Sequence, residues 1–88
     1  MCRNIRPLFN FDPPASEEEI RASALQFVRK VSGFSRPSKA NAEAFDHAVD
    51  EVADAARRLI VSLRSAAPPR DREMEALRSR ERSRQRFA

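Results

Sequence analysis

The chain has 88 residues, of which 34% are charged and only one is glycine, and it contains no Trp or Tyr. A chain of this length forms one domain at most, and its composition favours helices over strands. The single cysteine excludes an internal disulfide, which fits a reducing cytoplasm, and no apolar run reaches the roughly 20 residues of a membrane-spanning helix.

The formal net charge of +4 is unevenly distributed. Residues 1–69 hold 10 Lys or Arg and 9 Asp or Glu, a net +1, whereas residues 70–88 hold 7 Arg and 4 acids, a net +3. The basic character therefore belongs to the tail. We predict one helical domain over residues 1–69 and an Arg-rich, weakly docked or frayed helix or tail over residues 70–88.

Residues 1–15 are predicted to form an extended arm. Leu8, Phe9 and Phe11 provide apolar side chains, and Pro13-Pro14 follows. Proline fixes φ and disfavours helix at the residue before it, so a regular element stops before position 15. Polar residues interrupt every apolar stretch of the arm, which excludes a secretory signal peptide.

The first helix is predicted to begin after Ser16, because Ser16 and Glu19 match a capping box. Gly33, the only glycine, is expected at the left-handed position that ends a helix. The apolar residues that share one face at helical spacing are Ile20, Ala24, Phe27, Val28 and Val31. Leu25 lies off that stripe, and we expect the arm to cover it.

A second helix is predicted from about Lys39 to Ala66, with Ser38 as its N-cap and Pro68-Pro69 beyond its end. Its apolar residues alternate by four and three along one stripe, Phe45, Val49, Val52, Ala56, Leu59, Leu63 and Ala66. We interpret this stripe as packing against the first helix in the same chain, with a coiled-coil dimer as the alternative.

The end of the second helix is apolar on several faces. Four large side chains fall there, Leu59, Ile60, Val61 and Leu63. One neighbouring helix cannot cover all of them. We therefore predict an interaction face at these residues, covered by the arm or by a second subunit.

Cys2 is the most reactive side chain of the chain. Because an initiator Met before a small residue is normally removed, we expect Cys2 at the mature N-terminus, where its amine and thiol could chelate a metal. Arg3 and Arg6 would lower the pKa of the thiol, and Asn4 completes its surroundings. The alternative is that Cys2 is a small apolar residue packed against the helices.

His47 is the only histidine, and Glu43 and Glu51 lie four residues on either side of it. Histidine with carboxylates suits a divalent metal, so His47 is a distant candidate ligand beside Cys2. The patch faces away from the apolar stripe, so a solvated acidic face is the favoured interpretation. No cofactor is predicted, and a metal at Cys2 stays an open alternative.

The tail carries five arginines in two rows at helical spacing, Arg78, Arg80, Arg82, Arg84 and Arg86. Such arginines could contact phosphates in a salt-dependent way without sequence preference. No interleaved aromatic residues offer base stacking, and no specific nucleic-acid-binding motif is present. We expect the tail to dock weakly through Met74 and Leu77.

No Gly-rich phosphate loop, nucleophile elbow or two-histidine metal motif occurs, so we expect no enzyme activity. We expect the chain to be cytoplasmic and to bind a protein partner or a second copy of itself. We do not expect it to associate with a membrane. Nucleic-acid binding by the tail is a weaker alternative.

Several segments of the chain have a distinctive sequence. They are the start Met1-Cys2-Arg3-Asn4-Ile5, Leu8-Phe9-Asn10-Phe11, Pro13-Pro14-Ala15, residues 16–22, residues 26–34, residues 37–41, Phe45, residues 48–51 and residues 67–73. In these segments the chain resembles a family of short bacterial proteins known only as a domain of unknown function. The resemblance covers about residues 1–75. It implies a bacterial, cytoplasmic protein and no particular reaction.

Together these patterns predict an all-α fold. It consists of two main antiparallel helices, a weaker C-terminal helix and an extended N-terminal arm packed across them. The favoured function is a non-enzymatic module for self-association or partner binding, and a thiol or metal site at Cys2 is the alternative.

Overall fold

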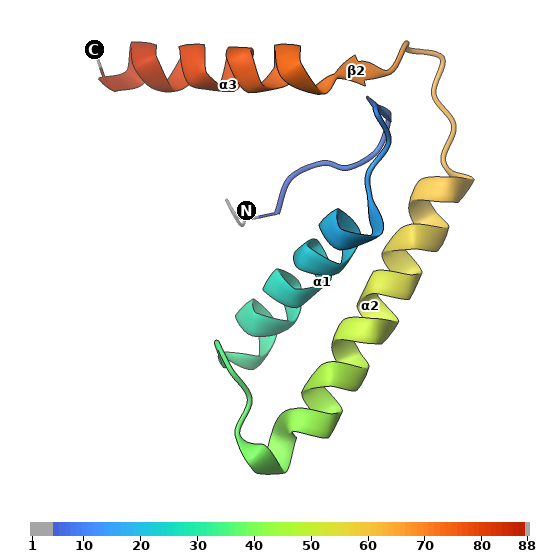
Figure 1. Ribbon diagram of the computed structural model, residues 1–88, viewed down its shortest axis with the longest axis vertical. Helices are drawn as coiled ribbons and strands as arrows, with labels where there is room; N and C mark the ends of the chain where they lie inside the picture. The colour runs from blue at the N-terminus through green and yellow to red at the C-terminus, as the bar shows by residue number, and fades with distance from the viewer. Residues whose placement is uncertain (1–4, 88) are drawn as a thin grey trace.

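The computed structural model describes residues 5–87, apart from the side chains of residues 86 and 87. It contains three α-helices, α1 (Glu17–Ser32), α2 (Ala42–Ser62) and α3 (Arg72–Phe87). Figure 1 shows α1 and α2 side by side, with α3 lying across the top of the pair. The prediction of a mainly helical protein is confirmed. Within the described residues, none of the helices combines the length and apolarity that crossing a membrane requires.

Two short strands, which the sequence did not predict, join the arm to the start of α3. β1 (Phe11–Asp12) pairs in parallel with β2 (Arg70–Asp71), so that Phe11 lies opposite Arg70. This pairing crosses the boundary predicted between residues 69 and 70. The first residues of the tail are therefore hydrogen-bonded to the arm.

α1 begins and ends as its sequence predicts. The Ser16 hydroxyl accepts a hydrogen bond from the Glu19 amide at 3.2 Å, and the Glu19 carboxylate accepts one from the Ser16 amide at 3.1 Å. At the other end, Gly33 adopts φ 79° and donates its N–H to the Arg29 carbonyl at 2.9 Å. A left-handed φ favours glycine, so the only glycine of the chain ends α1.

α2 is shorter than the predicted range of 39–66. It follows a 3-10 turn (Lys39–Asn41), and the Ser38 hydroxyl accepts from the Asn41 side chain instead of capping a backbone amide. The helix ends at Ser62, and Leu63 is extended, with φ −72° and ψ 147°. An extended residue advances the chain about 3.3 Å, against 1.5 Å in a helix, so leaving the helix early lets the chain reach β1.

The core is a seam between α1 and α2. Six buried side chains form it: Ile20, Ala24, Val28, Phe45, Val49 and Ala53. The predicted stripe of α1 contains its three members, but α2 contributes Ala53, which the predicted stripe omitted. Leu59 and Leu63 are 58% and 43% exposed. They lie beyond Arg57, which pairs with the first residue of α1, Glu17, so no part of α1 lies opposite them.

Leu8 and Phe11 of the arm line a pocket together with Ala22 and Ser23 of α1. Leu25, which the arm was expected to cover, is half-buried and lines a shallow groove with Asp46 and Val49 of α2. α2 therefore supplies part of the cover of Leu25.

The two predicted cap residues provide a matched test of helix capping. Replacing Ser16 with Ala removes an acceptor that satisfies a backbone amide, so the free energy of unfolding should fall by about 1 kcal/mol. Replacing Ser38 with Ala removes no cap bond to the backbone and should change it by less than about 0.5 kcal/mol. Urea unfolding followed by circular dichroism measures both, and equal losses would contradict this assignment.

Candidate functional site

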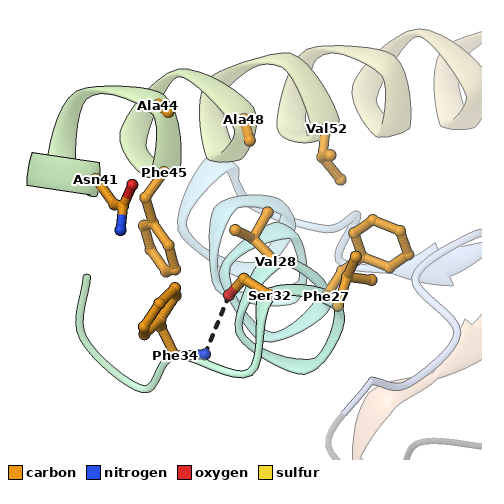
Figure 2. Close-up of a pocket in the computed structure, with 10 residues that line it drawn as sticks. Phe27, Val28, Ser32, Phe34, Asn41, Ala44, Phe45, Ala48 and Val52 are labelled. Atoms are coloured by element: carbon orange, nitrogen blue, oxygen red, sulfur yellow. Dashed lines mark hydrogen bonds between the residues drawn. The ribbon is translucent and has the colours of Figure 1, made fainter. Parts of the chain in front are cut away.

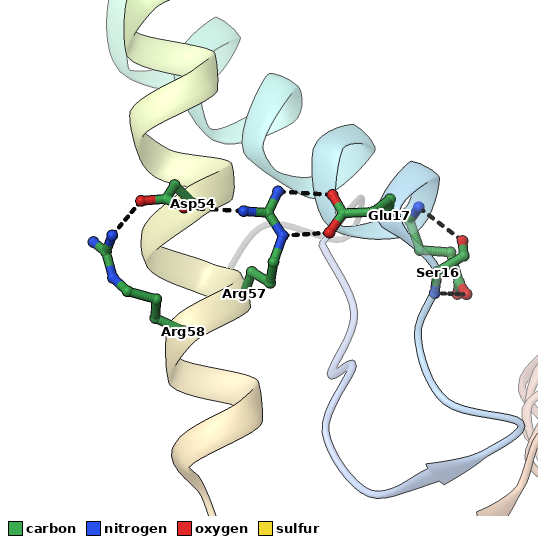
Figure 3. A network of polar contacts seen from close by, with 6 residues as sticks. Ser16, Glu17, Asp54, Arg57 and Arg58 are labelled. Carbon is green, nitrogen blue, oxygen red and sulfur yellow. Dashed lines mark hydrogen bonds and ion pairs between the residues drawn. The ribbon is translucent and has the colours of Figure 1, made fainter.

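One side of the α1–α2 pair is polar and held by ion pairs (Figure 3). Arg57 of α2 donates two hydrogen bonds to Glu17 of α1, one of them from Nη2 to Oε2 at 2.7 Å, and a third to Asp54 at 3.0 Å. Arg58 also pairs with Asp54, as its i,i+4 spacing predicts. Farther along the same side, Arg21 of α1 pairs with Asp50 of α2.

These ion pairs shift pKa values but contribute little stability. The hydrogen bonds from Arg57 lower the pKa of Glu17, and the same contact raises the pKa of Arg57. The two side chains are 64% and 39% exposed, so solvent screens their attraction and leaves little net contribution to stability. Their main effect is to keep this side of the helix pair charged and hydrated.

The opposite side of the pair is an open apolar groove of about 330 Å³ (Figure 2). Its lining comes from both helices and their connection: Phe27, Val28, Val31, Ser32, Phe34, Asn41, Ala44, Phe45, Ala48 and Val52. Three large apolar side chains on its α1 edge are solvent-exposed, Val31 by 71%, Phe27 by 47% and Phe34 by 43%. Contiguous apolar surface of this kind marks interaction sites more often than chance exposure does.

The end of α1 places Phe34 in the groove. The left-handed turn at Gly33 reverses the chain, and the Phe34 N–H donates to the Ser32 hydroxyl at 3.2 Å. Figure 2 shows the Phe34 ring next to the Phe45 ring as a result. Arg29 donates from Nε to the Ser35 carbonyl at 3.0 Å, which holds the connection in place. A hydrophobic contact after a glycine cap is a common helix ending.

A second polar site joins the arm, α1 and α3 around Arg72. Its guanidinium donates from Nε to the Pro13 carbonyl at 2.6 Å and from Nη1 to the Glu19 carboxylate at 2.7 Å. It also lies 5.4 Å from the centroid of the Phe11 ring, and the Arg70 guanidinium lies 5.6 Å from the same centroid. Cation–π contacts of this kind contribute about 0.5–2 kcal/mol each.

The backbone around Arg72 is fixed by two polar side chains, Asn10 directly before β1 and Asp71 at the end of β2. Asn10 has φ 64°, a conformation that asparagine tolerates better than most residues, and its amide donates to the Ala67 and Pro68 carbonyls at 3.3 Å each. The Asp71 carboxylate accepts from the Met74 amide at 2.9 Å and so caps α3. Asn10 and Asp71 therefore hold the chain on either side of the strand pair.

The predicted anchors of α3, Met74 and Leu77, are each 49% exposed. The contacts that tie α3 to the rest of the chain come instead from Arg72 and the β1–β2 pairing. The sequence offers little signal for this junction, because its partners lie more than 50 residues apart and are ordinary Phe, Arg and Glu.

Of the residues predicted for a thiol or metal site, the structure describes only His47. Cys2, Arg3 and Asn4 lie outside the described residues, so the prediction for Cys2 stays untested. His47 is 74% exposed and contacts only one of its two predicted carboxylates, with Nε2 2.7 Å from Glu51. Among the described residues, no group of three or more His, Cys, Asp or Glu side chains is arranged to hold a metal ion.

The predicted interaction face at the end of α2 stays a prediction. Ile60 packs partly against the core, whereas Leu59 and Val61 are 58% and 80% exposed. Leu59 and Val61 are two residues apart on a helix, so they point in different directions, in line with the several apolar faces that the sequence predicts there.

The sequence alone does not single out the groove. Phe27 and Val31 lie on the same apolar stripe of α1 as the buried Val28. This stripe is wider than one neighbouring helix can cover, and its width is the sequence signal that points to the groove.

The arginine rows lie along α3. Arg78 and Arg84 each contact a glutamate three residues earlier, Glu75 and Glu81, at 3.4 Å. Arg80 and Arg82 are on the same helix, and the side chain of Arg86 lies outside the described residues. These positions leave binding of nucleic acid by the tail as a prediction.

Arg72 provides a test of the α3 junction. Replacing it with Lys keeps the charge, but an ammonium group cannot reproduce the planar fork that meets Pro13, Glu19 and Phe11 together. The amide of Arg70, which donates to the Asn10 carbonyl at 2.8 Å, should then exchange with deuterium about tenfold faster. The control is Arg78→Lys, which should leave that rate unchanged; an equal effect of both would contradict the junction.

Glu19 predicts an acid-dependent loss of stability. Hydrogen bonds from Arg72, and then from the Ser16 amide, lower the pKa of Glu19 below its ordinary 4.5. A lowered pKa stabilises the fold at pH values above 4.5, and this contribution disappears as the pH falls through the lowered value. Thermal melts from neutral pH downward should therefore show a smaller acid loss for Glu19→Gln than for the unchanged chain. Glu18→Gln, in the same turn, should retain the full loss.

Comparison with known proteins identifies the family but no function. No curated protein and no solved structure matches the chain. A family model described as "Uncharacterized conserved protein (DUF2277)" matches residues 1–78, which confirms the resemblance drawn from the sequence. The chain therefore belongs to the DUF2277 family of uncharacterised conserved proteins.

Proposed function

We propose that this protein is a non-enzymatic interaction module that docks a protein surface in the groove between α1 and α2. The observation that carries the proposal is the difference between the two sides of the helix pair. One side carries the ion pairs of Arg57 and Arg21, and the other exposes Phe27, Val31 and Phe34.

The chemistry of the groove supports docking better than catalysis. Its polar lining residues are Ser32, whose hydroxyl already accepts from the Phe34 amide, and Asn41, whose side chain donates to Ser38. No described acidic or histidine side chain lines it. A partner that covers the apolar edge removes surface from water, at about 25 cal/mol for each Å² of apolar area.

A matched pair of valines tests the proposal. Val31 and Val61 are both largely exposed, by 71% and 80%, but only Val31 lines the groove. We expect Val31→Glu to abolish the species that chemical cross-linking joins to the protein in a native cell extract, because a charge in the groove would have to be desolvated. Val61→Glu should leave them intact.

Circular dichroism of both variants shows whether each is folded. If both retain the same cross-linked species as the unchanged protein, the groove is not the interaction surface.

A further inference from the structure

The chain exposes far more surface than a compact protein of its mass. Its accessible surface is 7396 Å², whereas a compact monomer of 10.0 kDa exposes about 5,200 Å². Its radius of gyration is 15.7 Å, against about 12 Å for a compact chain of this length. The excess of roughly 2,200 Å² is more than twice the 800 Å² or so that each partner gives up in a standard interface.

The excess follows from the flat shape of the molecule. It measures 44 × 37 × 18 Å, and α1 and α2 form a single layer of helices. The projecting α3 accounts for part of the excess, and the uncovered groove side of the helix layer adds to it. Stable domains contain at least two packed layers, so a second layer is missing on the groove side.

The groove side has two unlike halves (Figure 2). The α1 half is a ridge of large side chains, Phe27, Val31 and Phe34. On the α2 half, the small residues Ala44 and Ala48 leave a shallow row. A ridge beside a hollow is complementary to a second copy of itself, because a twofold rotation places each ridge over the hollow of the other copy.

Figure 2 shows where the ridge lies along the groove. Phe34 lies at the Phe45 end of the groove, and Phe27 lies at the other end, near Val52. Phe27 is therefore level with Ala48 and Val52, at the far end of the α2 row from Ala44.

We infer that a second copy of this chain occupies the groove, with Phe27 of each copy packed between Ala48 and Val52 of the other. A twofold axis along the helix pair leaves every residue at its own level and lays α1 of one copy over α2 of the other. Four helices then enclose one core, an arrangement that helix pairs commonly adopt. This inference rests on the proposed function and names its partner.

A second copy fits this face better than an unrelated partner. An unrelated protein would have to present a hollow and a ridge at matching levels, whereas a second copy presents both. The ion pairs of Arg57 and Arg21 stay on the outer side and remain hydrated. Desolvation of those charges is thereby avoided.

Light scattering during size exclusion, over a concentration series, tests the inference on the purified full-length chain. We expect a molar mass of twice 10.0 kDa for the unchanged protein. Phe27→Lys and Ala48→Glu should each weaken the dimer by at least about 30-fold, so that each variant alone is monomeric. Val61→Glu, outside the groove, should remain dimeric.

Mixing the two disruptive variants gives the sharper result. In a mixed dimer, the lysine introduced in one copy meets the glutamate introduced in the other at one contact, and the second contact is unchanged Phe27 on Ala48. An equimolar mixture of Phe27→Lys and Ala48→Glu should therefore regain the dimer mass, which misfolded variants could not do.

Each other outcome decides against the inference in a distinct way. A monomeric unchanged protein whose cross-linked partners in extract depend on Val31 overturns self-association and leaves the proposed function standing. A monomer whose cross-linked species ignore Val31 overturns both. A dimer that survives Phe27→Lys, or a mixture that stays monomeric while the unchanged protein dimerises, overturns the groove as the contact between copies.

Discussion

The close packing of α1 against α2, with Ala24 and Ala53 at its most buried positions, is the constraint on which the rest of the structure depends. These two side chains are 2% and 1% exposed, the lowest values in the core. Alanine at both positions lets the helices come near enough for Ile20, Val28, Phe45 and Val49 to pack around them. A larger residue at either alanine would separate the helices and force strain into a well-packed seam. This spacing sets the position of the groove and brings Arg57 within reach of Glu17.

Outside that seam, polar contacts between residues far apart in the sequence hold the chain together. The arm and α3 contribute only partly buried apolar groups, yet Arg72 links the Pro13 carbonyl, the Glu19 carboxylate and the Phe11 ring in one place. One nitrogen of this guanidinium, Nη2, is buried without a partner, which raises the cost of misplacing it. Glu19 serves two elements, since it also completes the cap of α1. The start of α1 and the docking of α3 are therefore coupled through one carboxylate.

The sequence predicts the local structure of this chain far better than it predicts the long-range contacts. Ser16, Glu19 and Gly33 mark the ends of α1 because caps depend on neighbours in the chain. The end of α2 could not be predicted from residues 63–66, because Leu63, Arg64 and Ala66 favour helix, whereas Leu63 is extended in the structure. The Arg72 junction was missed because its partners are distant. The groove was missed because Phe27 and Val31 lie on the same stripe as the buried Val28, and spacing alone does not show where a neighbouring helix stops.

The unequal sides of the helix pair bear on how far association can proceed. An apolar layer exposed on both sides would stack without limit, because each added copy would present a new apolar face. Here Glu17, Arg21, Asp50, Asp54 and Arg57 occupy one side, and stripping water from these charges would cost more than their contacts return. When two copies associate through the groove side, they bury the continuous apolar face of each helix pair. The charged side of each copy then faces outward. The same ion pairs that add little to the stability of one chain thus favour an assembly that closes at two copies.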